Sequence, residues 1–390
     1  MHNTPPILRD GQPERSATWL ELFFDLVFVV AIAQLSYFLK EDLSWSHFVD
    51  FALLFLPIWW LWMEYSYHAD LYDTQSSFFR FTTISIMFGM IVMATLIHRL
   101  KAEALYPVVM TYAVLTGINW VQYVRTYRKF PKARILARYQ VFGLPVIVGL
   151  LLVVWWLRPP HGDWLAAGVV LLQMAISPVA YLTTGNFPKQ QSHMPERFGL
   201  FTIIVLGETI VAVAQSLIEE EWTTRNLFLA VLGFSSAVLM WWLYFYRSDR
   251  EAISKALDDR SLLKRSFFYG YSHYFTFVAV AAFGIAWEEA IIADTIRLAP
   301  HLIAFIIGTL GLFLLSLGVM HWAMPNQFPP RVIMLRLGAV GLIVLLTQIT
   351  QAEVWILPGI FAVLATLCCT EYYIKLRQMK QSEERERTAA

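Results

Sequence analysis

Long apolar runs alternate with short polar stretches along this chain. A helix needs about 20 apolar residues to cross the hydrocarbon core of a bilayer. Lipid offers no water to backbone groups, so each such run should be helical. The runs lie at 18–39, 46–65, 78–98, 104–124, 136–157, 164–182, 198–218, 226–246, 266–286, 300–321, 332–350 and 354–374. The pattern predicts an all-α integral membrane protein with about twelve transmembrane helices.

The composition supports a membrane protein and removes other classes. Apolar residues make up 57% of the 390 residues and charged residues only 15%, whereas soluble domains carry about 25% charged residues. A net charge of +1 gives no field that recruits nucleic acid. The two cysteines, Cys368 and Cys369, are adjacent and form neither an ordinary disulfide nor a metal cluster. Phosphate-loop and zinc-protease motifs are missing from the sequence, so we expect no cofactor and leave a metal undecided.

The basic residues predict the orientation. If the spans alternate in direction, 24 of the 30 Lys and Arg residues fall on the side of the N-terminus, mostly in the loops Arg125–Arg138 and Arg247–Arg265 and in the C-terminal tail. Lys and Arg accumulate in cytoplasmic loops. Both termini are therefore predicted to be cytoplasmic.

The second half of the sequence resembles the first. Five short matches occur in the same order, at offsets between about 181 and 193 residues. They pair Val30–Gln34 with Val211–Gln215, Trp59–Leu61 with Trp241–Leu243, Ser77–Phe79 with Ser266–Phe268, Pro107 with Pro300, and Trp164–Gly168 with Trp355–Gly359. The matches predict two parallel six-helix repeats, 1–190 and 191–390, within one membrane domain. Parallel repeats are typical of transporters, in which the site lies at the repeat interface.

Charged residues inside the predicted spans are candidates for function. Glu21 and Asp25 share a helical face, and Asp25 lies about 10 Å past the start of its span. Arg197 and Glu208 share a face of the seventh span. Buried charges in membranes usually face the bundle interior or a water-filled path. We interpret Asp25 and Glu208 as cation or proton sites, with Glu21 at the cytoplasmic mouth; the alternative is carboxylates satisfied by neighbouring groups.

Other polar and aromatic residues have simpler explanations. Glu64, Arg80 and His273 are further candidates for the ion or substrate pathway, although a lone histidine more often fills a packing position. The amide side chains of Asn119, Gln122, Gln140 and Gln173 are predicted to form hydrogen bonds between helices. The pairs Trp59–Trp60, Trp155–Trp156 and Trp241–Trp242 are predicted to be anchors at the membrane interface.

Acidic loops allow a second interpretation. Asp70 and Asp73 follow the second span, and Asp249, Asp258 and Asp259 follow the eighth. Paired acidic loops can hold Mg²⁺ against a diphosphate, as in membrane-embedded transferases that act on lipid-like substrates. The alternative is that these aspartates cap helices and pair with nearby arginines.

Two long motifs resemble a known family. Residues 15–29 read RSATWLELFFDLVFV, residues 196–210 read ERFGLFTIIVLGETI, and Tyr271–His273 precedes Glu288. These motifs resemble those of the bacterial low temperature requirement A (LtrA) family over essentially the whole chain. The resemblance implies a multi-pass protein of the bacterial cytoplasmic membrane. The first helix is more remotely similar to that of potassium channels with a Phe-Ser-Asp motif and six-span repeats, with Phe24 in place of the serine.

The sequence therefore favours a transporter or an ion-conducting protein, which implies the lipid bilayer and an unknown ion or small molecule as partners and permits an oligomer. Its expected pathway residues are Glu21, Asp25, Arg80, Arg197, Glu208 and His273. The alternatives are a membrane-embedded enzyme that uses the acidic loops, and a receptor or scaffold.

Overall fold

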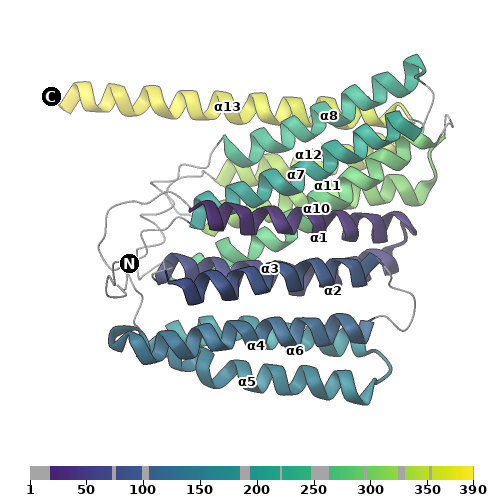
Figure 1. Ribbon diagram of the computed structural model, residues 1–390. Helices are drawn as coiled ribbons and strands as arrows, with labels where there is room; N and C mark the ends of the chain where they lie inside the picture. Colours follow the sequence, from purple (N-terminus) through teal and green to yellow (C-terminus); the bar gives the residue numbers. More distant parts are fainter. Residues whose placement is uncertain are drawn as a thin grey trace. The chain divides into compact units, whose positions relative to one another are not determined.

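The protein is all-helical where its structure is described. The computed structural model describes residues 18–72, 76–98, 105–184, 194–219, 222–246, 263–293, 295, 297–323, 330–350 and 354–389. In these ranges the chain forms twelve long α-helices and a short 3-10 helix (Figure 1). The prediction of an all-α protein is confirmed. Two compact units are present: unit 1 comprises Met1–Val205 with Arg250–Phe267, and unit 2 comprises Leu206–Asp249 with Phe268–Ala390.

The helices have the length and the surface of membrane spans. Eleven of the described helices are long and apolar enough to cross a bilayer. Large apolar side chains face outward on them, such as Phe81, Phe88 and Phe142, with about 70% of each exposed. Outward aromatic side chains of this kind are stable in lipid and costly in water. The protein is therefore a multi-pass membrane protein.

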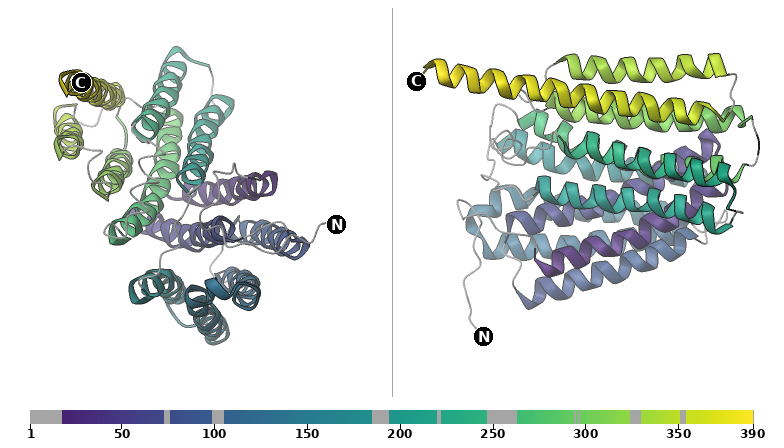
Figure 2. Two further views of the ribbon diagram at one scale, coloured as in Figure 1. Left: turned by 90° about the vertical axis from the view of Figure 1, so that its left-hand side faces the viewer. Right: turned by 90° about the horizontal axis from the view of Figure 1, so that it is seen from above.

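Unit 1 contains six complete helices and the start of a seventh. They are α1 (Trp19–Lys40), α2 (Trp45–Leu71), α3 (Ser77–His98), α4 (Leu105–Lys129), α5 (Arg134–Leu157), α6 (Gly162–Thr184) and the first part of α7 (Met194–Glu219). Helix α1 packs on α2 and α3, α2 packs on α6, and α5 packs on α4 and α6. The end-on view in Figure 2 shows α4, α5 and α6 as a group of three neighbouring helices.

Local sequence signals set the starts of α1 and α2. Thr18 caps α1, because its side chain accepts a hydrogen bond from the Glu21 amide while the Glu21 carboxylate accepts one from the Thr18 amide. Ser44 caps α2 in the same way by accepting from the His47 amide. These caps fix where Asp25 and Glu64 lie along their helices.

Unit 2 contains the rest of α7 and five further helices. They are α8 (Thr224–Phe245), α10 (Leu263–Ile292), α11 (Pro300–Ala323), α12 (Pro330–Thr350) and α13 (Ile356–Ala389). Helix α10, whose residues from Phe268 onward belong to this unit, is mostly buried from Phe277 to Ile291. Its Gly284 approaches Thr209 of α7, and the indole of its Trp287 donates to the Leu229 carbonyl of α8. Helix α12 packs between α11 and α13, and α13 also contacts α8.

Two groups of residues test the minor predictions. All four amide side chains form hydrogen bonds between helices: Asn119 and Gln173 with Glu64, Gln122 with Thr82, and Gln140 with Ser177, so that prediction is confirmed. The prediction of interfacial anchoring for Trp59 and Trp60 is wrong. Both are buried in the middle of α2, because α2 continues to Leu71 and places them far from its end.

Candidate functional site

The Asp25 carboxylate is buried near the start of α1. Its side chain is 3% exposed and lies about 9 Å past the first residue of the helix. One oxygen atom, Oδ1, forms both polar contacts of this side chain to the described residues. Arg197 Nη2 lies 2.6 Å from it, and Trp62 Nε1 donates to it at 2.7 Å. The predicted pathway residues Asp25 and Arg197 are therefore brought together within unit 1.

Three further polar atoms of this pair have no hydrogen-bond partner in the described part of the chain. Among the described residues, Asp25 Oδ2 and the Nε and Nη1 atoms of Arg197 are buried and unpaired. The guanidinium instead lies over the rings of Trp62 and Tyr65, with 5.7 and 5.5 Å between its carbon and the ring centroids. Such cation–π contacts stabilise a desolvated cation. The pair is thus a single charged contact between two groups that each have further bonding capacity.

Aromatic rings surround the ion pair and exclude water. Phe24 stacks on Tyr65 with 3.6 Å between centroids. Trp62 packs against Phe201 at 4.5 Å and Phe198 at 5.7 Å. Glu21 is also buried and acts electrostatically on Arg197, while its carboxylate completes the cap of α1. Trp62, which in the sequence resembles any other residue of an apolar run, is the second donor to the Asp25 carboxylate.

A second buried carboxylate of unit 1 is Glu64 of α2. It is 4% exposed and about 10 Å before the end of α2. Its Oε2 atom accepts hydrogen bonds from Gln173 Nε2 of α6 at 2.8 Å and from Asn119 Nδ2 of α4 at 3.3 Å. The Tyr112 hydroxyl donates to Gln173 Oε1 at 2.9 Å. These residues form a chain of polar side chains from α4 through α6 to α2.

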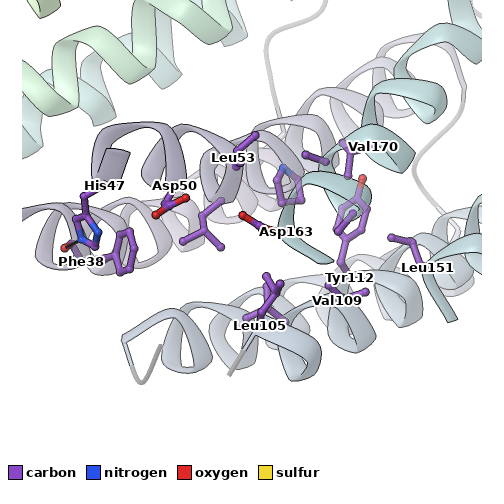
Figure 3. Close-up of a pocket in the computed structure, with 15 residues that line it drawn as sticks. Phe38, His47, Asp50, Leu53, Leu105, Val109, Tyr112, Leu151, Asp163 and Val170 are labelled. Atoms are coloured by element: carbon purple, nitrogen blue, oxygen red, sulfur yellow. Dashed lines mark hydrogen bonds between the residues drawn. The ribbon is translucent and has the colours of Figure 1, made fainter. Parts of the chain in front are cut away.

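A pocket of about 350 Å³ opens between the ends of α1, α2, α4, α5 and α6. Figure 3 shows the carboxylates of Asp50 and Asp163, and the ring of Tyr112, among its apolar walls. His47 lies at the Phe38 end, where its Nε2 atom donates a hydrogen bond of 2.8 Å to the Phe38 carbonyl. Because these helix ends are opposite to the start of α1, the pocket and Asp25 belong to opposite ends of unit 1. No sequence pattern predicts this pocket, since its lining comes from five separate helices.

The predicted residues of unit 2 have different surroundings. His273 is fully buried, and its two ring nitrogens lie 2.9 Å from the Tyr244 hydroxyl and 2.8 Å from the Tyr269 carbonyl. This arrangement suits a neutral imidazole that donates to the carbonyl and accepts from the hydroxyl. Glu208 is half-buried in α7. Arg80, in unit 1, is exposed near the start of α3.

A buried ion pair in unit 2 was missed by sequence reasoning. Arg336 of α12 meets Glu371 of α13 through two contacts, Nε to Oε1 at 2.8 Å and Nη2 to Oε2 at 3.1 Å. Its third nitrogen, Nη1, lies 2.7 Å from His321 Nδ1 of α11. This bidentate pair joins three helices and satisfies every nitrogen of the guanidinium.

The acidic loop residues are mostly outside the described part of the chain. Asp70 lies in the last turn of α2, whereas Asp73, Asp249, Asp258 and Asp259 fall outside the described residues. Among the residues that are described, no group of three or more His, Cys, Asp or Glu side chains could hold a metal ion.

Comparison with known proteins identifies the family. The family model of the bacterial low temperature requirement A protein (LtrA) matches residues 16–369. The chain belongs to the LtrA family. This LtrA-family chain is also similar to an uncharacterized protein of Rhizobium meliloti (strain 1021), with 29% identity over 268 residues, 66% of this chain and 65% of the relative's length. No solved structure matches it.

Membership of the LtrA family gives the ion pair a particular place. Asp25 lies in the segment 15–29 and Arg197 lies in the segment 196–210, which are the two motifs that resembled the family. The contact between Asp25 and Arg197 therefore joins these two distant segments inside unit 1 of the LtrA-family protein.

Proposed function

We propose that this LtrA-family protein is a transporter or ion-conducting protein coupled to a cation or a proton, and that the Asp25–Arg197 pair is part of its pathway. The observation that carries the proposal is the incomplete bonding of two fully buried charges. One contact of 2.6 Å joins them, and three of their polar atoms have no partner among the described residues.

Physical cost is the reason to assign a working role to this pair. Removing two charges from water costs several kcal/mol for each ion, and only excellent geometry offsets that cost. A pair with one contact and three unpaired atoms does not reach such geometry. A contribution to the stability of the fold is therefore a poor explanation for the presence of these two buried charges. Charges at membrane depth are characteristic of ion and proton pathways.

The same geometry allows the pair to switch. A proton or a cation at the free Oδ2 atom of Asp25 would weaken the attraction to Arg197. The guanidinium would still be stabilised by the rings of Trp62 and Tyr65. In this proposal Glu21, which acts electrostatically on Arg197 from the start of α1, passes a cation toward Asp25. Glu208 of α7 is proposed as a further carboxylate of the same function in unit 2.

The test measures transport by a variant that lacks both charges of the pair, so that neither charge is left buried without a partner. The double variant Asp25→Asn/Arg197→Gln removes both charges, while Asn keeps an oxygen that can accept from Trp62. Flux of a panel of cations, protons and small solutes should be measured in proteoliposomes. Flux of the substrate should fall at least about tenfold, which corresponds to about 1.4 kcal/mol in a rate barrier, while the melting temperature stays near that of the parent.

A matched control removes the other buried pair. The double variant Arg336→Gln/Glu371→Gln eliminates a pair of equal charge and similar burial in unit 2. Its flux per folded molecule should equal that of the parent. Parent-like flux in the Asp25/Arg197 double variant, with the panel showing robust transport by the parent, would overturn the assigned role of this pair.

A further inference from the structure

Glu64 is a buried carboxylate with no cation beside it in the part of the chain that the structure describes. Its hydrogen bonds there are those from Asn119 and Gln173. Gln173 lies about 16 Å past the start of α6, and Glu64 lies about 10 Å before the end of α2, so the carboxyl is near the middle of the membrane thickness. An ionised carboxylate there, without a counter-ion, costs several kcal/mol.

The hydrogen bonds around Glu64 lack one donor. Both amide donors go to Oε2, which leaves Oε1 buried and without a partner in the described structure. Asn119 Oδ1, on the neighbouring amide, is likewise buried and unpaired. Both unpaired atoms are acceptors when Glu64 is ionised. A proton on Oε1 removes the buried charge and supplies the missing donor.

The surrounding groups do not replace that proton. The titratable groups that face this region are His68 on α2 and the hydroxyls of Tyr112 and Tyr123 on α4. His68 Nε2 lies 3.1 Å from the Thr126 hydroxyl. Helix α6 contributes the neutral Gln173, α3 contributes Thr82 while its Arg80 is exposed, and on α1 Asp25 is bound by Arg197. No described basic side chain forms an ion pair with Glu64.

The pocket supplies a route to this carboxyl. Tyr112 lines the pocket, and its hydroxyl is joined to Glu64 through Gln173 by hydrogen bonds of 2.9 and 2.8 Å. Figure 3 shows Asp50 and Asp163 between Tyr112 and the His47 side of the pocket. Carboxylates at a mouth raise the local concentration of cations, including protons.

We propose that Glu64 is a reversible proton-binding site that exchanges its proton through the pocket bounded by Asp50, Asp163 and Tyr112. The inference deepens the proposed function by naming the proton as a coupling ion. Only the purpose of proton binding, which is coupling to transport, rests on the proposed function. Proton binding itself is measured without any transport assay, so the two proposals can fail separately.

Chemical labelling in lipid tests the protonated state. A hydrophobic carbodiimide adds across the O–H of a neutral carboxylic acid, and the adduct rearranges to a stable acylurea without a leaving group. Peptide mass spectrometry should find Glu64 modified in the full-length protein in liposomes. Labelling should fall at least about tenfold over two pH units on the alkaline side of its titration, and Glu371, which Arg336 holds by two contacts, should stay unmodified.

Three outcomes of this experiment would overturn the proton site. Absence of labelling at every pH in folded protein excludes a protonated Glu64, and labelling that ignores pH excludes reversible exchange. Suppression of labelling by sodium or potassium ions at fixed pH would identify a metal-cation site in place of a proton site. The variant Glu64→Gln, an isostere of the neutral acid, should melt like the parent, since the site is neutral for part of its cycle.

A water-soluble carbodiimide tests the route. Ala166 lines the pocket, whereas its neighbour Leu165 is 50% exposed on the outside of α6 and does not line it. Ala166→Phe should slow modification of Glu64 by the soluble reagent at least about fivefold, as expected for a narrowed entrance, while Leu165→Phe leaves it unchanged. Equal rates in the two variants would exclude the pocket as the route.

Discussion

Arg197 contacts Asp25 through one nitrogen and one oxygen, 2.6 Å apart, in a site from which water is excluded. Trp62 donates to the same oxygen. The remaining oxygen of Asp25 and two nitrogens of Arg197 have no hydrogen-bond partner among the described residues. This ion pair is therefore less completely bonded than the Arg336–Glu371 pair, although both are buried. The difference between the two pairs leads to two predictions.

The first prediction is a double-mutant cycle on Asp25 and Arg197. Arg197→Gln leaves the Asp25 charge buried without its cation and should destabilise the protein by about 3–5 kcal/mol. Adding Asp25→Asn removes that charge and should restore most of the loss, giving a coupling energy of about 3 kcal/mol, at the upper end for residues in contact. Denaturation in detergent gives the free energy of unfolding for the parent, the two single variants and the double variant. Additive losses would show that the two charges do not interact.

The second prediction compares the two pairs. Glu371→Gln removes the charge that holds the Arg336 guanidinium by two contacts and should cost about 3–5 kcal/mol. Asp25→Asn should cost less, because Arg197 loses one contact and keeps its position over Trp62 and Tyr65. Melting temperatures of the two single variants give the order. The opposite order would show that the Asp25–Arg197 pair is the main structural contact.

Helix existence could be predicted from the sequence, but the extent of several helices could not. The predicted span 46–65 ends before His68, because the polar residues after Glu64 interrupt the apolar run. In the structure α2 continues to Leu71. Asn119 and Gln173 bond the buried Glu64 from two other helices. A single sequence does not show which helices supply such partners.

The sequence predicts only part of the candidate site, because it does not show which helices supply the partners of a buried charge. Asp25 and Arg197 could be identified from their charge inside apolar segments, and the structure joins them. Trp62 and the pocket around Tyr112 could not, because an indole donor and an apolar wall resemble ordinary packing residues in sequence. Arg336 and Glu371 carried the same signal as Asp25 and stood near the ends of predicted spans, where charges are common. The predicted repeat of 1–190 and 191–390 remains a prediction.

The third prediction concerns the close approach of α7 and α10 in unit 2. A methyl group on Gly284 would lie 2.7 Å from the Thr209 Cα atom, which is backbone and cannot move away cheaply. Gly284→Ala should therefore destabilise the protein by about 1–3 kcal/mol. Gly338→Ala on α12 meets no atom within 4 Å and should be neutral or stabilising by up to about 1 kcal/mol. Equal melting temperatures for the two variants would contradict the packing of α10 on α7.

The last prediction is the direction in which unit 1 crosses the membrane. The excess of Lys and Arg on the side of the N-terminus predicts that α1 begins in the cytoplasm. The linker from α1 to α2, and with it the pocket of Asp50 and Asp163, then faces the opposite compartment, while the end of α4 faces the cytoplasm. Ser46 and Lys129 are exposed at these two ends. In a background with Cys368 and Cys369 changed to alanine, an impermeant thiol reagent on intact cells should label Ser46→Cys at once. It should label Lys129→Cys only after the membrane is opened. The reverse pattern would place the N-terminus outside, and protons would then reach Glu64 from the cytoplasm.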